Sequence, residues 1–229
     1  MSFERLILLP FISPPAAGKG TQTQILCETY QLARFDTGSQ LRAVAQKPTE
    51  LGKRVAAILA EGQLVDTPVV MDVLKDGLQD ALTQASPQAE TVPVLLDGFP
   101  RNLEQTNALF ELAATTGLHI PQAFYFDVPY EVITERAIYR RIDSETGAIY
   151  NLKFNPPPAD VPESRLTHRS DDYPERVEKR LKAYEQETAP ILARFEEKGL
   201  LTRVDANKPM QEVTQILVRL FDQHVLQVQ

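Results

Sequence analysis

The chain has 229 residues and a net charge of −7, with 43% hydrophobic and 24% charged residues. A chain of this length can bury a full core, and this composition is ordinary for a soluble globular protein, so we expect one domain with insertions. The acidic balance argues against general nucleic-acid binding, which needs a basic face. No apolar run reaches the roughly 18 residues that cross a bilayer, and no signal-peptide layout precedes the first apolar stretch. The sequence predicts an intracellular protein.

Cys27 is the only cysteine. A single thiol forms neither an internal disulfide nor a zinc site built from several cysteines. We therefore interpret Cys27 as a small, buried apolar residue rather than as a nucleophile.

Strands and helices are expected to alternate along most of the chain. In chain order the expected elements are a strand at Leu6–Leu9, a helix at Lys19–Tyr30, a strand at Thr91–Leu96, a helix at Leu103–Thr116, a strand at Gln122–Asp127, a helix at Tyr130–Arg141, a long helix at Tyr173–Lys198, a strand at Leu200–Asp205 and a helix over about 209–225. This alternation predicts an α/β fold with a parallel sheet covered on both faces. Ligands then bind at the carboxyl ends of the strands.

Two stretches depart from the alternation. Residues 37–85 contain helical patterns with no strand between them. Residues 142–168 are rich in Pro, Asn, Asp and Ser, yet carry the apolar Ile149, Tyr150, Leu152 and Phe154. A plain surface loop would not need those apolar side chains, so the second stretch is predicted to be a lid over a site.

The segment "LLPFISPPAAGKGTQ" (Leu8–Gln22) joins the first strand to the first helix. Such a turn can aim backbone N–H groups at a phosphate, with help from the positive end of the helix. Gly18, Lys19, Gly20 and Thr21 fit this use, although the strict G-x-x-x-x-G-K-[ST] pattern is not met because Ser13 stands at its first glycine. Alone, the segment is equally compatible with an ordinary turn.

Several further motifs resemble those of the adenylate kinases, in the nucleoside monophosphate kinase family. "GKGTQTQ" is similar to the donor-phosphate loop, and "LLDGFPRNLEQT" (Leu95–Thr106) is similar to the LDGFPRxxxQ signature. The other matching segments are "DTGSQLRA" (Asp36–Ala43), "EGQLV" (Glu61–Val65), "ERAIYRR" (Glu135–Arg141), "TGAIYNLKFNPP" (Thr146–Pro157), "RLTHRSDD" (Arg165–Asp172), "ERVEKRLKAY" and "VDANKP" (Val204–Pro209). The resemblance covers nearly the whole chain.

The resemblance implies a P-loop, three-layer α/β/α fold with a central parallel sheet. It implies a core of residues 1–35, 73–141 and 173–229, a helical monophosphate-binding insertion at 36–72 and a lid at 142–172. Both insertions are expected to close over the core. The implied reaction is MgATP + AMP ⇌ 2 ADP in a cytoplasmic monomer, with Mg²⁺ as cofactor.

Site roles follow from the resemblance by position. Catalytic roles fall on Lys19, Arg101, Arg140, Arg169 and Arg180. ATP binding falls on Ala17, Gly18, Lys19, Gly20, Thr21, Arg136, Ile149, Tyr150 and Lys208. AMP binding falls on Thr37, Arg42, Leu64, Val65, Gly98, Arg101, Gln105, Arg169 and Arg180. Thr21 and Asp97 would lie near Mg²⁺, while Asp171 and Asp172 would hinge the lid or pair with arginines.

The basic residues also make sense on chemical grounds. Phosphoryl transfer needs two nucleotides held in line and the charge on the moving group neutralised. Arginine suits this task because its planar fork can grip phosphate oxygens in pairs. Arg136 and Arg140 are four residues apart and share one helix face. Any one of these arginines could instead be a solvated surface residue.

The expected lid contains no cysteine, and His168 is its only histidine. A zinc site is therefore not expected there. Asp143, Ser144, Thr146 and Asp160 could form a hydrogen-bonded substitute. A lid of this length also argues against the short-lid UMP/CMP kinases.

The chain departs from the family pattern in its donor loop. Ser13 and Ala16 replace glycines, Ser39 replaces an aspartate that helps to organise Mg²⁺-bound water, and "PFI" (Pro10–Ile12) reads as an insertion after a strand that should stop by Leu9. A positive φ at Ser13 or Ala16 would cost about 1–2 kcal/mol.

Three hypotheses remain open from the sequence. The chain is an active adenylate kinase, a catalytically weak nucleotide-binding homologue with an impaired donor loop, or a kinase for another monophosphate such as UMP or CMP. Thr37 and Gln105 speak against the third.

Overall fold

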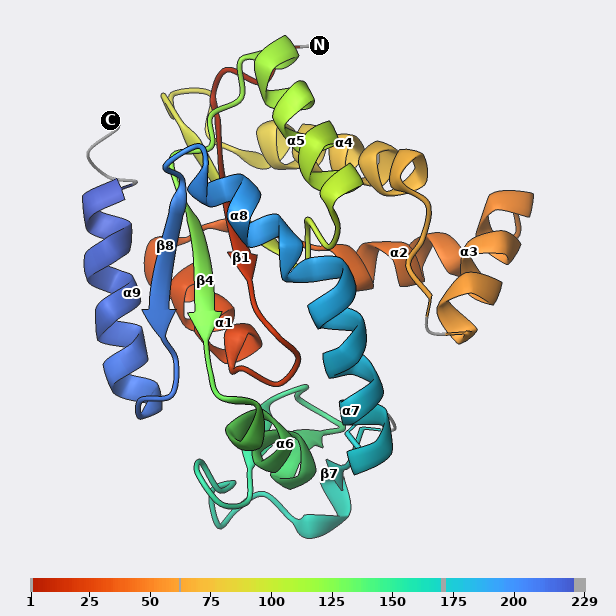
Figure 1. The fold of residues 1–229 in the computed structure, drawn as a ribbon, viewed down its shortest axis with the longest axis vertical. Coiled ribbons are helices and arrows are strands. Elements are labelled where there is room, and N and C mark those ends of the chain that lie inside the picture. The colour runs from red at the N-terminus through yellow and green to blue at the C-terminus, as the bar shows by residue number, and fades with distance from the viewer. Residues whose placement is uncertain (1, 62, 170–171, 225–229) are drawn as a thin grey trace.

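The computed structural model describes residues 2–61, 63–169 and 172–224. At its centre lies a parallel sheet of five strands in the order β2-β3-β1-β4-β8 (Figure 1). The strands are β1 (Leu6–Ile12), β2 (Ala33–Asp36), β3 (Val92–Asp97), β4 (Ala123–Asp127) and β8 (Leu201–Asp205). The predicted parallel α/β fold is confirmed, but β2 was missed because it is only four residues long and carries two charges.

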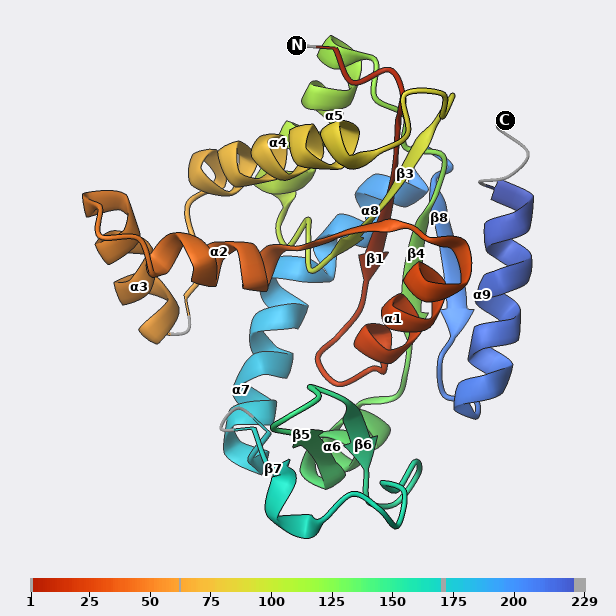
Figure 2. The same cartoon turned by 180° about the vertical axis from the view of Figure 1, so that it is seen from behind.

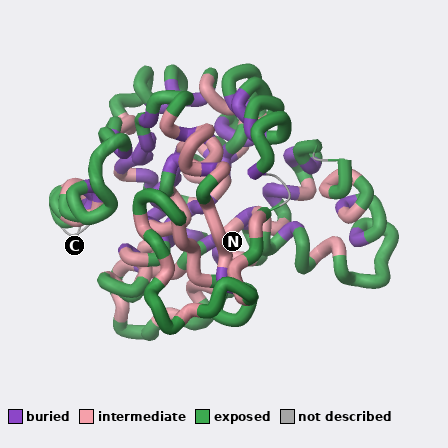
Figure 3. The backbone as a smooth tube through the Cα atoms, turned by 90° about the horizontal axis from the view of Figure 1, so that it is seen from below, coloured by how far each residue is buried: buried purple, intermediate pink, exposed green. Residues whose placement is uncertain are grey.

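Helices cover both faces of this sheet (Figures 1 and 2). The side chains of β1 alternate between the two faces, and each face has its own hydrophobic cluster. Ile7 and Leu9 pack in the cluster that includes α1 (Lys19–Tyr30) and α9 (Met210–His224). Leu6 and Leu8 pack with α4 (Thr67–Gln84) and α5 (Leu103–Thr116) on the other face. Figure 3 shows the buried residues gathered inside the molecule, with exposed residues on the outer sides of the helices.

The expectation that the first strand stops by Leu9 was wrong. β1 continues through Pro10 to Ile12 and pairs with β3 as far as Phe11 and with β4 at Phe11 and Ile12, so Pro10–Ile12 is part of the strand and not an insertion after it. Leu8 donates to the carbonyl of His119, which shows that even-numbered residues of β1 direct their backbone groups toward the β4 side. Pairing with β4 starts only at Phe11, so the missing N–H of Pro10 falls where the ladder has not yet begun.

The single helix expected over Tyr173–Lys198 is divided in the structure. α7 (Pro174–Ala183) leads into a π-helical turn at Tyr184–Thr188, and α8 (Pro190–Glu196) follows. Pro190 has no N–H to donate and its ring disfavours a regular α-turn before it, so the chain widens to an Ala189-to-Tyr184 backbone bond of 2.8 Å. The helix α6 (Tyr130–Tyr139) also ends two residues earlier than expected.

Two segments project from the core near the carboxyl ends of the strands (Figure 2). One contains α2 (Thr37–Ala45) and α3 (Glu50–Ala60), as the helical pattern predicted. The other, expected to be irregular, contains a small antiparallel sheet of β5 (Arg140–Asp143), β6 (Ile149–Asn151) and β7 (Leu166–Thr167), with a 3₁₀ turn at Glu163–Arg165. No helix among the described ranges is both long and apolar enough to span a membrane.

Candidate active site

The loop between β1 and α1 occupies the carboxyl edge of the sheet. Gly18 precedes α1 with a φ of 90°, which a glycine adopts without strain. Ala16 has a φ of 57°, in the left-handed region that side chains disfavour. Ser13 is not among the residues with positive φ, so only one of the two glycine replacements carries backbone strain.

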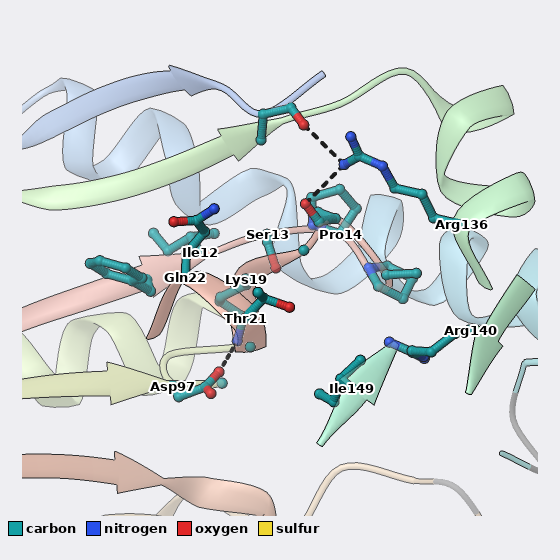
Figure 4. Close-up of a pocket in the computed structure, with 18 of the residues that line it drawn as sticks. Ile12, Ser13, Pro14, Lys19, Thr21, Gln22, Asp97, Arg136, Arg140 and Ile149 are labelled. Carbon is teal, nitrogen blue, oxygen red and sulfur yellow. Dashed lines mark hydrogen bonds and ion pairs between the residues drawn. The ribbon is translucent and has the colours of Figure 1, made fainter. Parts of the chain in front are cut away.

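Arg136 fastens this loop from α6. Its Nη1 donates to the carbonyl of Ala17 at 3.2 Å and to the carbonyl of Ala206 at 2.9 Å (Figure 4). Burial lowers the pKa of Arg136 from its usual value. The guanidinium thus joins the donor loop to the segment that follows β8.

Lys19, in the first turn of α1, forms an ion pair with Asp97 at the end of β3 (Figure 4). Arg34 lies on the other oxygen of the same carboxylate, with Nη2 2.6 Å from Oδ2. Burial alone would raise the pKa of Asp97, but the two cations outweigh this and the pKa lies below its usual value. Burial lowers the pKa of Lys19, and its ion pair with Asp97 opposes that shift.

Arg101 follows β3 in the chain and also lines the cavity. Its Nε donates to the carbonyl of Gly98 at 2.8 Å, and its backbone N–H donates to Oε1 of the buried Gln105 at 2.8 Å. Gly98 has a φ of 81°, and a Cβ there would lie 2.9 Å from Arg101 Nη2. The backbone at Gly98 therefore leaves room for this guanidinium. Burial lowers the pKa of Arg101.

Two further arginines flank the expected lid along the chain, Arg140 just before it and Arg180 in α7 after it. Arg140 donates through two nitrogens to the fully buried carboxylate of Asp172, and Arg180 Nη1 lies 3.6 Å from the same carboxylate. Asp172 pairs with arginines, one of the two roles expected for it, whereas Asp171 lies outside the described residues. Ile149 of β6 approaches the donor loop, since a Cβ on Gly20 would lie 3.8 Å from its Cδ1 (Figure 4).

These elements enclose one cavity of about 1060 Å³. That volume is at the upper end of ligand sites and is large enough for more than one nucleotide-sized molecule. The expected site residues that line it are Ala17, Gly18, Lys19, Gly20, Thr21, Arg42, Leu64, Asp97, Gly98, Arg101, Arg136, Arg140, Ile149, Tyr150, Arg169, Arg180 and Lys208. Thr37, Val65 and Gln105 are buried and do not line it.

Sequence reasoning missed four charged residues that line the cavity: Arg34, Asp36, Glu135 and Glu187. Arg34 and Asp36 both belong to β2, and Arg34 Nη2 also lies 3.5 Å from Asp36 Oδ2. Recognition of β2 would have placed both at the carboxyl edge of the sheet, where ligands bind. Exposed Phe154 of the lid also lines the cavity.

The lid turn is organised by Asp143. This residue is 1% exposed, and its carboxylate accepts from Arg165 and from the backbone of Glu145 and Thr146. The bond from Arg165 holds the pKa of Asp143 well below its usual range. Of the suggested substitute for a metal site, Asp143 and Thr146 lie in this network, whereas Asp160 is exposed and Arg165 was not foreseen.

The donor side of the cavity suits a magnesium ion. Thr21 and Asp97 provide a hydroxyl and a carboxylate there, the hard oxygen donors that Mg²⁺ prefers. Among the described residues, no three His, Cys, Asp or Glu side chains form a metal-binding group. Few protein ligands are needed when substrate phosphates and water complete the shell.

Comparison with known proteins agrees with this geometry. The family model of adenylate kinase matches residues 11–200. The chain is 40% identical over 211 residues to an adenylate kinase of Sorangium cellulosum (strain So ce56), covering 91% of this chain and 93% of that protein. It is 35% identical over 228 residues to one of Photorhabdus laumondii (95% and 100% covered), and 36% over 209 residues to one of Archaeoglobus fulgidus (90% and 93% covered). The chain therefore belongs to the adenylate kinase family of phosphotransferases.

Proposed function

We propose that this chain is an active adenylate kinase that catalyses MgATP + AMP ⇌ 2 ADP. The observation that carries the proposal is a single cavity lined by cations from the donor loop, the core and the lid. The chain as a whole has a net charge of −7, so this gathering of cations is local. A local cationic cavity concentrates small anionic ligands without attracting nucleic acid.

On the donor side, Lys19 holds the transferred phosphate and the N–H groups of Gly18, Gly20 and Thr21 cradle its neighbours. Arg136, Ile149, Tyr150 and Lys208 surround the base and ribose of ATP. Thr21 and Asp97 would hold Mg²⁺, and the ion would supply neutralising charge to the phosphates when it is bound.

On the acceptor side, Arg42 and Arg101 bind the phosphate of AMP, and Leu64 lines the cavity beside its base with buried Val65 as support. Gly98, Thr37 and Gln105 support this half of the site. Arg140, Arg169 and Arg180 neutralise charge that develops on the moving phosphoryl group. Catalysis then depends on alignment and charge, with no covalent intermediate required.

Segments 36–72 and 142–172 close over the two nucleotides. Closure excludes water, which would otherwise accept the phosphoryl group. The proposal includes a cytoplasmic monomer, as the family resemblance implies.

The test is ADP formation in a coupled assay with MgATP and a panel of AMP, UMP and CMP. We expect turnover with AMP, and a loss of more than tenfold in kcat/KM for Lys19→Ala and for Arg101→Ala. Equal turnover with UMP or CMP would contradict the assigned acceptor. No turnover with any monophosphate would exclude the proposed reaction.

One observation favours a second candidate, a nucleotide-binding homologue with an impaired donor loop. Ala16 lines the cavity at a position where the family pattern has a glycine, so its methyl group takes up space beside a bound phosphate. Calorimetry separates the two, because an impaired loop binds AMP but not ATP. ATP binding of ordinary strength would exclude this candidate.

A further inference from the structure

Arg34 is a positively charged residue that lines the cavity, and the proposed reaction gives it no role. It lies on β2, and its side chain is 35% exposed at the cavity wall. Its Nη2 lies 2.6 Å from Asp97 Oδ2 and 3.5 Å from Asp36 Oδ2. One guanidinium therefore bridges the carboxylates of Asp97 and Asp36.

Asp97 is enclosed by two cations. Lys19 contacts Oδ1 and Arg34 contacts Oδ2, and the carboxylate is only 10% exposed. Both oxygens that could accept a hydrogen bond from metal-bound water thus lie against protein cations. With Asp36 included, the cluster of Lys19, Arg34, Asp36 and Asp97 has no net charge.

Asp36 is fixed independently of Arg34. Its Oδ1 accepts the backbone N–H of Ser39 at 2.9 Å and so caps α2. Its Oδ2 lies toward Arg34. A divalent cation that approached this pair of carboxylates would have to compete with the guanidinium for the same oxygens.

We propose that Arg34 is a positioning residue that holds Asp97 and Asp36 in the metal-free protein and sets the divalent-cation concentration the enzyme needs. The proposal rests on the proposed function, in which Mg²⁺ lies beside Asp97. When MgATP binds, Arg34 gives up these oxygens to metal-bound water. Until then it prevents the carboxylates from collecting free cations and from repelling each other.

The test is the affinity of the nucleotide-free, full-length protein for Mn²⁺, a spectroscopic substitute for Mg²⁺, followed by electron paramagnetic resonance. Arg34→Gln leaves the cluster with a charge of −1, so we expect Mn²⁺ to bind about tenfold more tightly. Arg34→Lys retains the charge and should bind Mn²⁺ as the wild type does. Asp36→Asn keeps a helix-capping side chain but leaves the cluster positive, so Mn²⁺ should bind about tenfold more weakly.

Arg203→Gln is the matched control, because it removes one positive charge from a surface arginine that pairs with Glu196 outside the cavity. It should leave Mn²⁺ affinity unchanged. A second measurement is the free Mg²⁺ concentration for half-maximal activity at fixed ATP, which should fall in Arg34→Gln.

Unchanged Mn²⁺ affinity in Arg34→Gln would overturn the proposal, as would an equal gain in Arg203→Gln. A raised KM for ATP with unchanged metal binding would instead make Arg34 a phosphate contact and would also overturn it. These results are distinguishable from failure of the proposed function, because Mn²⁺ binding is measured without nucleotide and without turnover.

Discussion

Ala16→Gly tests whether the donor loop stores strain in the ligand-free protein. Ala16 adopts a φ of 57°, which costs an alanine about 1–2 kcal/mol and a glycine almost nothing. Glycine also gives the unfolded chain more freedom, which offsets about 0.4–1 kcal/mol. Loss of a half-buried methyl offsets a few tenths of a kcal/mol more. The net expectation is a small stabilisation, of about 0.5 kcal/mol.

Ala17→Gly is the matched control in the next residue. Ala17 is 3% exposed and is not among the residues with positive φ, so glycine there has the same unfolded-state cost, loses a fully buried methyl and relieves no strain. It should destabilise the protein by about 1.5 kcal/mol. The two variants should therefore differ by about 2 kcal/mol, or roughly 4–8 °C in Tm.

The assay is thermal unfolding of the two variants and the wild type, with ATP affinity from calorimetry. Because the strained φ is present without ligand, its cost falls on folding, and Ala16→Gly should change the Kd for ATP by less than about threefold. Equal stabilities of the two variants would refute the strain argument. A tenfold tighter Kd in Ala16→Gly would show that the strain is instead imposed by ATP.

Three further predictions concern the acceptor wall and the lid. Gly98→Ala should raise the KM for AMP and lower Tm, because the new Cβ would lie 2.9 Å from Arg101 Nη2. Gly199→Ala is the control, since Gly199 also has a positive φ, of 67°, but no atom lies within 4 Å of the position of its Cβ. This control should lower Tm and leave the KM for AMP unchanged. Asp172→Asn removes the buried carboxylate that pairs with Arg140 and Arg180. The free energy of unfolding in urea should therefore fall by about 2–3 kcal/mol. An unchanged free energy of unfolding would show that these ion pairs do not stabilise the fold. Asp143 has a lowered pKa in the folded protein, so its contribution is present above about pH 4, the unfolded pKa, and is lost as the pH falls further. The Tm gap between wild type and Asp143→Asn should thus narrow below about pH 4, and a constant gap would exclude the ion pair as its cause.

The sheet could be predicted where strands are apolar runs between helical patterns. Val92–Asp97 and Ala123–Asp127 form strands within one residue of their expected positions, since buried parallel strands leave an unambiguous hydrophobic signal. β2 escaped detection because its inward positions alternate with Arg34 and Asp36, whose charges serve the cavity. The hydrophobic pattern did not reveal this strand, because two of its four residues are charged side chains that line the cavity.

The continuation of β1 through Pro10 and the π-helical turn before Pro190 were not predicted, for a different reason. Proline rules describe the backbone groups that proline removes, but not whether the surrounding structure needs them. At Pro10 the neighbouring ladder starts one residue later, and at Pro190 the helix continues after one wide turn. The first outcome depends on a strand that is distant in sequence, whereas the second depends on the local bond from Ala189 to Tyr184.

The cavity also shows how a protein keeps many cations together before its ligand arrives. Lys19 and Arg34 lie on Asp97, Arg140 and Arg180 lie on Asp172, and Arg101 and Arg136 donate to backbone carbonyls. Each of these partners reduces repulsion among the cations and fixes a side chain that would otherwise lose rotamer entropy on binding. A phosphate that binds one of these cations must replace a bond that the cation already makes within the protein. Part of the attraction between nucleotide and cavity therefore only compensates for the bonds that are lost. Affinity for the nucleotides should therefore be moderate for so cationic a site, because the arrangement favours alignment over tight binding.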